Sequence, residues 1–115
     1  MTGSITAEEI KKLDEQDMLE KLKGFSRQCR EGYSLPSPAL LPGNDFNRVV
    51  FCGMGGSAIG GDIISALACE HSEIPCFVNR NYGLPSYADS KTLAVIMSYS
   101  GNTEETLSAL EKARE

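Results

Sequence analysis

A short run of β-forming residues, RVVFC at 48–52, passes directly into the glycine-rich segment GMGGSAIGGD at 53–62. Valine and phenylalanine favour strands, whereas repeated glycine allows the chain to turn sharply and to approach another group closely. A helix with one buried stripe is predicted for about 57–69, because apolar residues recur there at every fourth position, namely Ile59, Ile63 and Leu67. A strand, a tight turn and a helix in this order predict the first unit of a parallel sheet.

Two further strands are predicted at 74–80 and 92–98, with the turn-rich segment NYGLPSYADS between them. The second of these is apolar on both faces, as expected for a strand covered by helices on both sides. A helix follows at 103–115, acidic in its first turn and basic near its end. This order predicts an α/β fold, a doubly wound parallel sheet with the flavodoxin-like strand order 2-1-3. In that order the loops after the first and third strands meet, and a ligand site is expected there.

The residues before the first strand predict a helical arm and a connection. We assign 1–32 to the arm, 33–47 to the proline-rich connection and 48–115 to the α/β domain. Two helix starts are expected in the arm, each with a capping residue and a glutamate three positions later: Thr6 with Glu9, and Asp17 with Glu20. The arm is predicted to be amphipathic, with one apolar face formed by Ile10, Leu13, Met18, Leu19, Leu22 and Phe25.

Composition limits the classes of partner. The 115 residues allow one compact domain, and the net charge of -5 argues against a nucleic-acid partner, which a basic surface would attract. No apolar run reaches the roughly 18 residues that a membrane helix needs, and the first residues do not resemble a secretory signal, so we expect a cytoplasmic protein without a membrane partner. The wide spacing of the four cysteines predicts free thiols rather than a zinc or redox site.

The two loops expected to meet both suit a phosphate group. In the first, Gly56 and Ser57 stand at a helix start, where backbone N–H groups lack partners inside the helix. In the second, SYSGNTEET, Ser98, Ser100 and Thr103 carry hydroxyls at a strand end and at the start of the next helix. Neutral donors to a charged oxygen contribute roughly 1.5 to 3 kcal/mol each, so several of them can hold a phosphate without a cation. The sequence therefore predicts a substrate-binding site for a phosphate monoester at these five residues.

Two alternatives stay open on the residues alone. The glycines could serve only a tight turn, and the hydroxyls could serve only to cap a helix. A second possibility is a dinucleotide site, because Gly53, Gly55 and Ala58 satisfy G-x-G-x-x-A after a strand. The second strand then ends in Asn79 and Arg80 in place of an acidic residue, which suits NADP better than NAD. This possibility gives no reason for the hydroxyl-rich second loop and ranks second.

Three segments together carry a resemblance to a known family. GMGGSAIGGD, RNYGLP and SYSGNTEETL, in this order and spacing, resemble the amino-terminal part of a sugar isomerase (SIS) domain, most closely that of the bifunctional phosphoglucose/phosphomannose isomerase family. The resemblance extends from about position 17 to the end of the chain, and it identifies 48–115 as the first part of such a domain. It implies an enzyme that interconverts glucose 6-phosphate or mannose 6-phosphate with fructose 6-phosphate, using two tandem SIS domains, as a homodimer without metal or organic cofactor.

The resemblance also implies what this chain lacks. In the family a glutamate and a histidine move the proton between neighbouring carbons and help to open the sugar ring. Glu73, Glu104 and His71 do not match those positions, so we expect an incomplete, inactive enzyme that retains the phosphate site. Arg80 matches a family position, and its side chain is expected to face the pocket. A phosphosugar sensor built on the same domain is the alternative, although the acidic arm suits a DNA-binding protein poorly.

Overall fold

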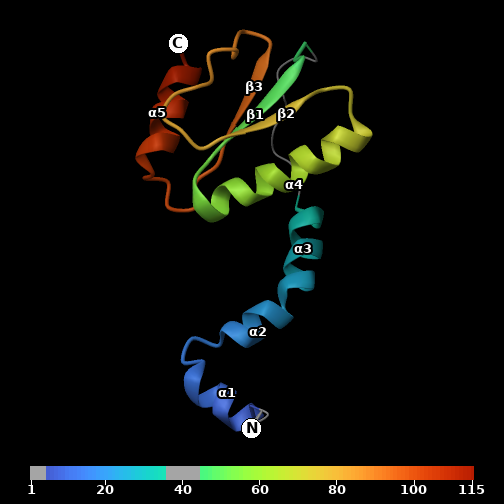
Figure 1. Cartoon of the computed structure of the whole chain (residues 1–115), viewed down its shortest axis with the longest axis vertical. Helices are drawn as coiled ribbons and strands as arrows, with labels where there is room; N and C mark the ends of the chain where they lie inside the picture. Colours follow the sequence, from blue (N-terminus) through green and yellow to red (C-terminus); the bar gives the residue numbers. More distant parts are fainter. Residues whose placement is uncertain (1–4, 36–44) are drawn as a thin grey trace. The chain divides into compact units, whose positions relative to one another are not determined.

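The computed structural model describes residues 5–35 and 45–115, and the chain divides into two units, Met1–Leu40 and Leu41–Glu115. The first unit contains α1 (Ala7–Leu13), α2 (Met18–Lys23) and α3 (Phe25–Ser34) (Figure 1). The second unit contains β1 (Arg48–Cys52), α4 (Gly55–His71), β2 (Cys76–Asn79), β3 (Thr92–Ile96) and α5 (Glu104–Ala113). The predicted connection at 33–47 lies largely outside the described residues, and α3 runs two residues further than the predicted end of the arm.

The three strands form one parallel sheet in the order β2-β1-β3, which confirms the predicted fold class (Figure 1). Val50 at the centre of β1 lies opposite Phe77 on one side and Ala94 on the other. Because all three strands run in the same direction, their carboxyl ends meet at one edge of the sheet. The loops that follow β1 and β3 therefore start side by side.

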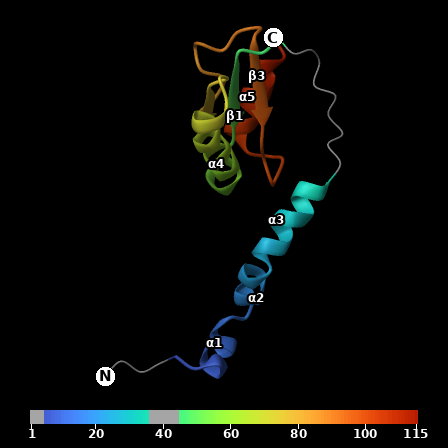
Figure 2. The same cartoon turned by 90° about the vertical axis from the view of Figure 1, so that its right-hand side faces the viewer.

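Alternate residues of β1 face different helices. Val50 and Cys52 are buried in one cluster with Ala109 of α5. Phe51, between them in sequence, points to the opposite face, where a β-carbon added at Gly61 of α4 would lie only 2.7 Å from its own. Since successive side chains of a strand point to opposite faces, α4 and α5 cover the two sides of β1 (Figure 2).

The predicted buried stripe of α4 is wrong. Ile59, Ile63 and Leu67 are 54%, 57% and 55% exposed, and the helix buries Ala58 and Gly61 instead. The helix lies too close to β1 for large side chains to fit beneath it, so its small residues face the sheet. The sequence is apolar on both sides of this helix, and the four-residue spacing alone does not distinguish the two sides.

One of the two predicted caps in the arm is confirmed. Thr6 and Glu9 form a reciprocal capping box at the start of α1. Asp17 makes no side-chain hydrogen bond to α2, because it adopts a left-handed conformation with φ 51°. The carboxylate of Asp14 accepts hydrogen bonds from the N–H groups of Met18 and Leu19 in its place. Across 5–35 and 45–115, every helix is too short or too polar to cross a membrane.

Candidate functional site

The loops after β1 and β3 touch at the carboxyl edge of the sheet. The Met97 N–H donates a hydrogen bond of 2.8 Å to the Cys52 carbonyl. A β-carbon at Gly53 would lie 2.9 Å from the Met97 carbonyl oxygen, so any larger residue there would force the loops apart. Glycine at this position therefore permits the close approach that joins the two loops.

Three hydroxyls gather in the second loop. The Ser98 Oγ lies 3.4 Å from the Ser100 Oγ, and both lie 3.3 Å from the Thr103 Oγ1. Backbone N–H groups within the loop already donate to the two serine oxygens, that of Gly101 to Ser98 and that of Asn102 to Ser100. Each serine oxygen accepts from the backbone, so its proton points either to a neighbouring hydroxyl of this cluster or to another acceptor.

Ser57 joins this group from the first loop. Its hydroxyl oxygen accepts a 3.3 Å hydrogen bond from the N–H of Tyr99, the residue between the two serines of the second loop. Ser57 was expected near the capping position of its helix, but α4 begins at Gly55 and its N-cap is Met54. The hydroxyl thus stands within the first turn of the helix, where it contacts the other loop. Ser57 thus contacts the loop that contains Ser98 and Ser100, although it lies 41 positions or more before them in the chain.

A cavity of about 460 Å³ is lined by Met54, Gly56, Ser57 and Tyr99. Ser57 is therefore the one predicted hydroxyl in this lining, and Ser98, Ser100 and Thr103 do not contribute to it. Tyr99 is fully exposed, with its ring directed away from the protein core. Tyr99 and Met54 were not predicted from the sequence, where the only signal was that Tyr99 stands between two predicted binding residues and Met54 stands two positions before another. The cavity lining carries no charged side chain, so any anion here would meet only neutral donors and helix starts.

Thr103 is the N-cap of α5, as its sequence position predicts, yet its side chain accepts no hydrogen bond from the first turn. The hydroxyl contacts Ser98 and Ser100 instead. The next residue, Glu104, accepts a 3.1 Å hydrogen bond from the Tyr82 hydroxyl, and this carboxylate raises the pKa of Tyr82. The Tyr82 hydroxyl is therefore held in its neutral, donating form next to the start of α5.

The remaining polar candidates lie elsewhere. Arg80 does not line the cavity beside Ser57; it forms an ion pair with Asp62 of α4. His71 ends α4 and Glu73 follows it, at the opposite end of the sheet from the hydroxyls. Within the described parts of the chain, no three histidine, cysteine, aspartate or glutamate side chains gather as a metal site would require.

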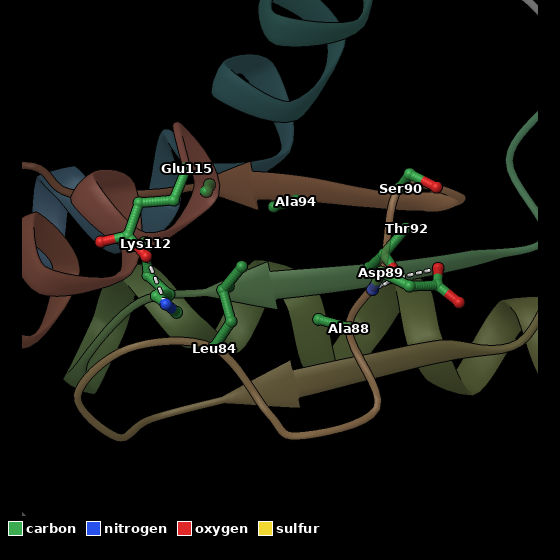
Figure 3. Close-up of a pocket in the computed structure, with 9 residues that line it drawn as sticks. Leu84, Ala88, Asp89, Ser90, Thr92, Ala94, Lys112 and Glu115 are labelled. Carbon is green, nitrogen blue, oxygen red and sulfur yellow. Dashed lines mark hydrogen bonds and ion pairs between the residues drawn. The ribbon is translucent and has the colours of Figure 1, made fainter.

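A larger cavity of about 610 Å³ lies beside the start of β3 and the end of α5 (Figure 3). It is separate from the hydroxyls of Ser57, Ser98, Ser100 and Thr103. Leu84 and Ala88 come from the loop before β3, whereas Lys112 belongs to α5 and pairs with Glu115. None of the five predicted binding residues lines it. This larger cavity is therefore distinct from the predicted phosphate site.

Each known protein that matches this chain does so over only part of that protein's own length. No protein-family model and no solved structure matches the chain. A bifunctional phosphoglucose/phosphomannose isomerase of Caldicellulosiruptor bescii is 42% identical over 99 residues, which cover 84% of this chain and 29% of that protein. A protein of the same name from Thermoplasma volcanium is 47% identical over 68 residues, 59% of this chain and 21% of that protein.

A third relative has a different name. The D-glucosamine-6-phosphate 4-epimerase of Sulfolobus acidocaldarius is 35% identical over 68 residues, 59% of this chain and 21% of that protein. The chain thus spans less than a third of the length of each of these relatives. The matches confirm that this chain resembles a part of the bifunctional phosphoglucose/phosphomannose isomerase family.

Proposed function

We propose that the loops after β1 and β3 bind the phosphate of a hexose phosphate in an isomerase that interconverts glucose 6-phosphate or mannose 6-phosphate with fructose 6-phosphate. The observation that carries this proposal is the meeting of Ser57 with the second loop, where Ser98, Ser100 and Thr103 lie within 3.4 Å of one another. Hydroxyls from two distant segments are thus brought to the same edge of the sheet, three of them in contact with one another and Ser57 in contact with the backbone between two of them, which suits a group with several equivalent oxygens.

The chemistry of these donors supports a phosphate in particular. Ser57, Ser98 and Ser100 each accept a backbone N–H, and a phosphate oxygen, being a stronger acceptor than a neighbouring hydroxyl, is expected to attract their protons. Hydrogen bonds to a charged acceptor contribute roughly 1.5 to 3 kcal/mol each, so four hydroxyls can hold a dianion without a cation. The first turns of α4 and α5 add N–H groups and the positive ends of their helix dipoles.

The names of the relatives support a phosphate-binding site that they share. The reactions in those names differ, so we propose that other residues carry them out. Two reactions are named among them, an isomerisation and a 4-epimerisation, and each name includes a phosphorylated hexose. A phosphate site common to both is expected in the part that this chain matches. The proton transfer needs a base, and we propose that neither His71 nor Glu73 supplies it, because both lie at the far end of the sheet.

The other features of the proposal come from the resemblance. We assign 1–32 to a helical arm, 33–47 to a connection and 48–115 to the first part of a SIS domain. The whole enzyme is proposed to be a cytoplasmic homodimer with a phosphosugar substrate and without a cofactor. Gly56, next to Ser57 and in the lining of the cavity, is proposed to let the ligand approach the backbone.

Titration calorimetry of the purified chain with glucose 6-phosphate tests the phosphate site. Changing both Ser100→Ala and Thr103→Ala removes two donors, and the dissociation constant should rise about tenfold or more. The matched control is Ser90→Ala, which removes a hydroxyl beside the other cavity and should leave binding unchanged. Equal affinity of the double variant and the unchanged chain would remove the phosphate role from these residues.

Activity is tested separately. We expect the 115-residue chain alone to show no isomerisation of glucose 6-phosphate above the rate without protein, because the family's base and ring-opening residues have no match in it. Turnover above that background would contradict the proposal that the chain lacks its catalytic groups. Such turnover would leave the assignment of the phosphate site untouched.

A further inference from the structure

The loop between β2 and β3 runs along one face of α5 (Figure 1). The Gly83 N–H donates a 3.1 Å hydrogen bond to the Ser108 hydroxyl, in the middle of the helix. The preceding residue, Tyr82, donates its hydroxyl proton to the Glu104 carboxylate at 3.1 Å, in the first turn. Glu104 and Ser108 are four positions apart and therefore share one face of the helix. The two contacts align the loop with α5 and bring Tyr82 to the start of this helix.

The backbone next to Tyr82 is held in place by the fold. The Asn79 Nδ2 donates to the Gly83 carbonyl at 2.8 Å, and Gly83 adopts a left-handed conformation with φ 66°. Leu84 packs against the buried core cluster of the domain. Tyr82 itself is 61% exposed, so its ring adds little to that core. Its hydrogen bond to Glu104 is therefore the contact that calls for an explanation.

The Glu104 carboxylate belongs to the residue that follows Thr103 of the proposed phosphate site. The Thr103 hydroxyl contacts Ser98 and Ser100, and it accepts no hydrogen bond from the first turn of α5. The first N–H groups of a helix have no acceptor inside it, and they attract carboxylates as well as phosphates. A freely moving Glu104 carboxylate would therefore be an internal anion that occupies the N–H groups a phosphate would use.

We propose that Tyr82 is a positioning residue of the phosphate site, whose hydroxyl holds the Glu104 carboxylate away from the free N–H groups of α5 and so keeps them for the phosphate of the substrate. This inference rests on the proposed function, because it assigns a role to Tyr82 at the same site. Tyr82 contacts no ligand in this role and acts through Glu104.

The charges around the phenol agree with this role. The hydrogen bond to Glu104 raises the pKa of Tyr82, and the charge of Glu105, the other acid of the first turn, raises it further. The phenol therefore stays protonated near neutral pH and remains a donor. A hydrogen bond from a hydroxyl to an ionised carboxylate is stronger than one between neutral groups. Tyr82 can thus retain the carboxylate although both side chains are exposed to water.

Titration calorimetry with glucose 6-phosphate compares the unchanged chain with Tyr82→Phe, Glu104→Gln and the double variant. Tyr82→Phe should raise the dissociation constant about two- to fivefold, because the released carboxylate is attracted to the start of α5 and competes with the phosphate. Adding Glu104→Gln should restore the affinity, since the uncharged amide is a weak competitor. The ratio of the dissociation constants of Tyr82→Phe and the unchanged chain should approach one at about 1 M salt, which screens exposed charges.

Two matched controls separate this role from general effects. Tyr87→Phe removes a hydroxyl from the same loop and should leave the dissociation constant unchanged, because Tyr87 packs against Phe77 through its ring. Glu105→Gln removes an equal charge from the same turn of α5. Added to Tyr82→Phe, it should leave most of the loss in place, because the Tyr82 hydroxyl donates to Glu104 instead.

Hydrogen exchange of the chain without phosphosugar provides a second measurement. The amides of the first α5 turn should exchange more slowly in Tyr82→Phe, where the Glu104 carboxylate reaches them, and the double variant should return to the rate of the unchanged chain. The thermal unfolding midpoint should be the same in all of these variants, because the side chains concerned are exposed.

The outcomes distinguish this inference from the proposed function. An unchanged dissociation constant in Tyr82→Phe, or a loss that Glu104→Gln does not restore, would overturn the inference, and so would unchanged exchange at the first α5 turn. Normal binding by the chain with both Ser100→Ala and Thr103→Ala would overturn both proposals. Loss of binding in that chain, together with no effect of Tyr82→Phe, would overturn this inference alone.

Discussion

Asn79 is the residue that fixes the loop after β2. Its side chain is almost fully buried, and its Nδ2 donates hydrogen bonds to the carbonyls of Gly83 at 2.8 Å and Asn81 at 3.3 Å. Its Oδ1 accepts from the Asn81 N–H at 3.3 Å. The Gly83 N–H in turn donates to Ser108 of α5. The Asn79 side-chain amide therefore holds the loop after β2 in a turn. Gly83 connects this loop to α5, the helix that Thr103 precedes.

Replacing Asn79 by alanine should destabilise the α/β unit by about 1 to 3 kcal/mol, because two carbonyls lose their donor in a partly buried place. Urea unfolding followed by circular dichroism measures this change. Asn81→Ala is the control, since the Asn81 side chain is exposed and only its backbone takes part in the network. If the two variants have the same midpoint, the side chain of Asn79 does not hold the loop.

At the scale of elements, α4 contains two adjacent glycines in opposite environments. A β-carbon at Gly61 would meet Phe51 at 2.7 Å and Val78 at 3.3 Å, and one at Gly60 would meet nothing. Gly61→Ala should therefore destabilise the fold by roughly 1 to 3 kcal/mol through overpacking, whereas Gly60→Ala should stabilise it by up to about 1 kcal/mol. Thermal unfolding of both variants under dilute conditions gives the comparison. Changes of the same sign in both would show that α4 does not press against β1 as closely as described.

The start of α2 depends on the charge of Asp14. The N–H groups of Leu19 and Met18 donate to its carboxylate, and these hydrogen bonds lower the pKa of Asp14 below its ordinary value of 3.8. A carboxyl with a lowered pKa in the folded state stabilises that state above the ordinary pKa and loses this contribution as the pH falls through the lowered value. The first turn of α2 should therefore unwind selectively in acid.

Nuclear magnetic resonance of Met18 and Leu19 measures this effect as the pH falls from about 5 to about 2. Asp14→Asn should remove most of the pH dependence at both amides, because the titrating carboxylate is gone. Asp17→Asn is the control and should keep it, since the Asp17 side chain makes no capping hydrogen bond. A pH dependence that follows Asp17 would show that the cap expected from the sequence is the true one.

For the whole molecule, the sequence was sufficient for the topology and for the meeting of the loops after β1 and β3. The order of strands and helices permits few parallel arrangements, so the β2-β1-β3 sheet and the meeting of the two loops followed from general rules. The hydroxyls of Ser57, Ser98, Ser100 and Thr103 could be identified because their residue types are unusual at strand ends and helix starts.

The sequence did not determine three other features, and each has a physical reason. The buried side of α4 was assigned wrongly because both of its sides are apolar, and only the distance to β1 selects the small residues. The cap of α2 was assigned wrongly because two aspartates stand near its start, and backbone conformation decides between them. Tyr99 was missed because its contribution is a backbone N–H, which every residue except proline carries.

Thr103 begins α5 without capping it, since its hydroxyl turns toward the two serines instead. The first amides of this helix are thus left for an acceptor that comes from solution. An anion that occupies the place would complete the helix, so occupancy and the order of the α5 start are thermodynamically linked. Hydrogen exchange at the amides of the first α5 turn should therefore slow when the site fills.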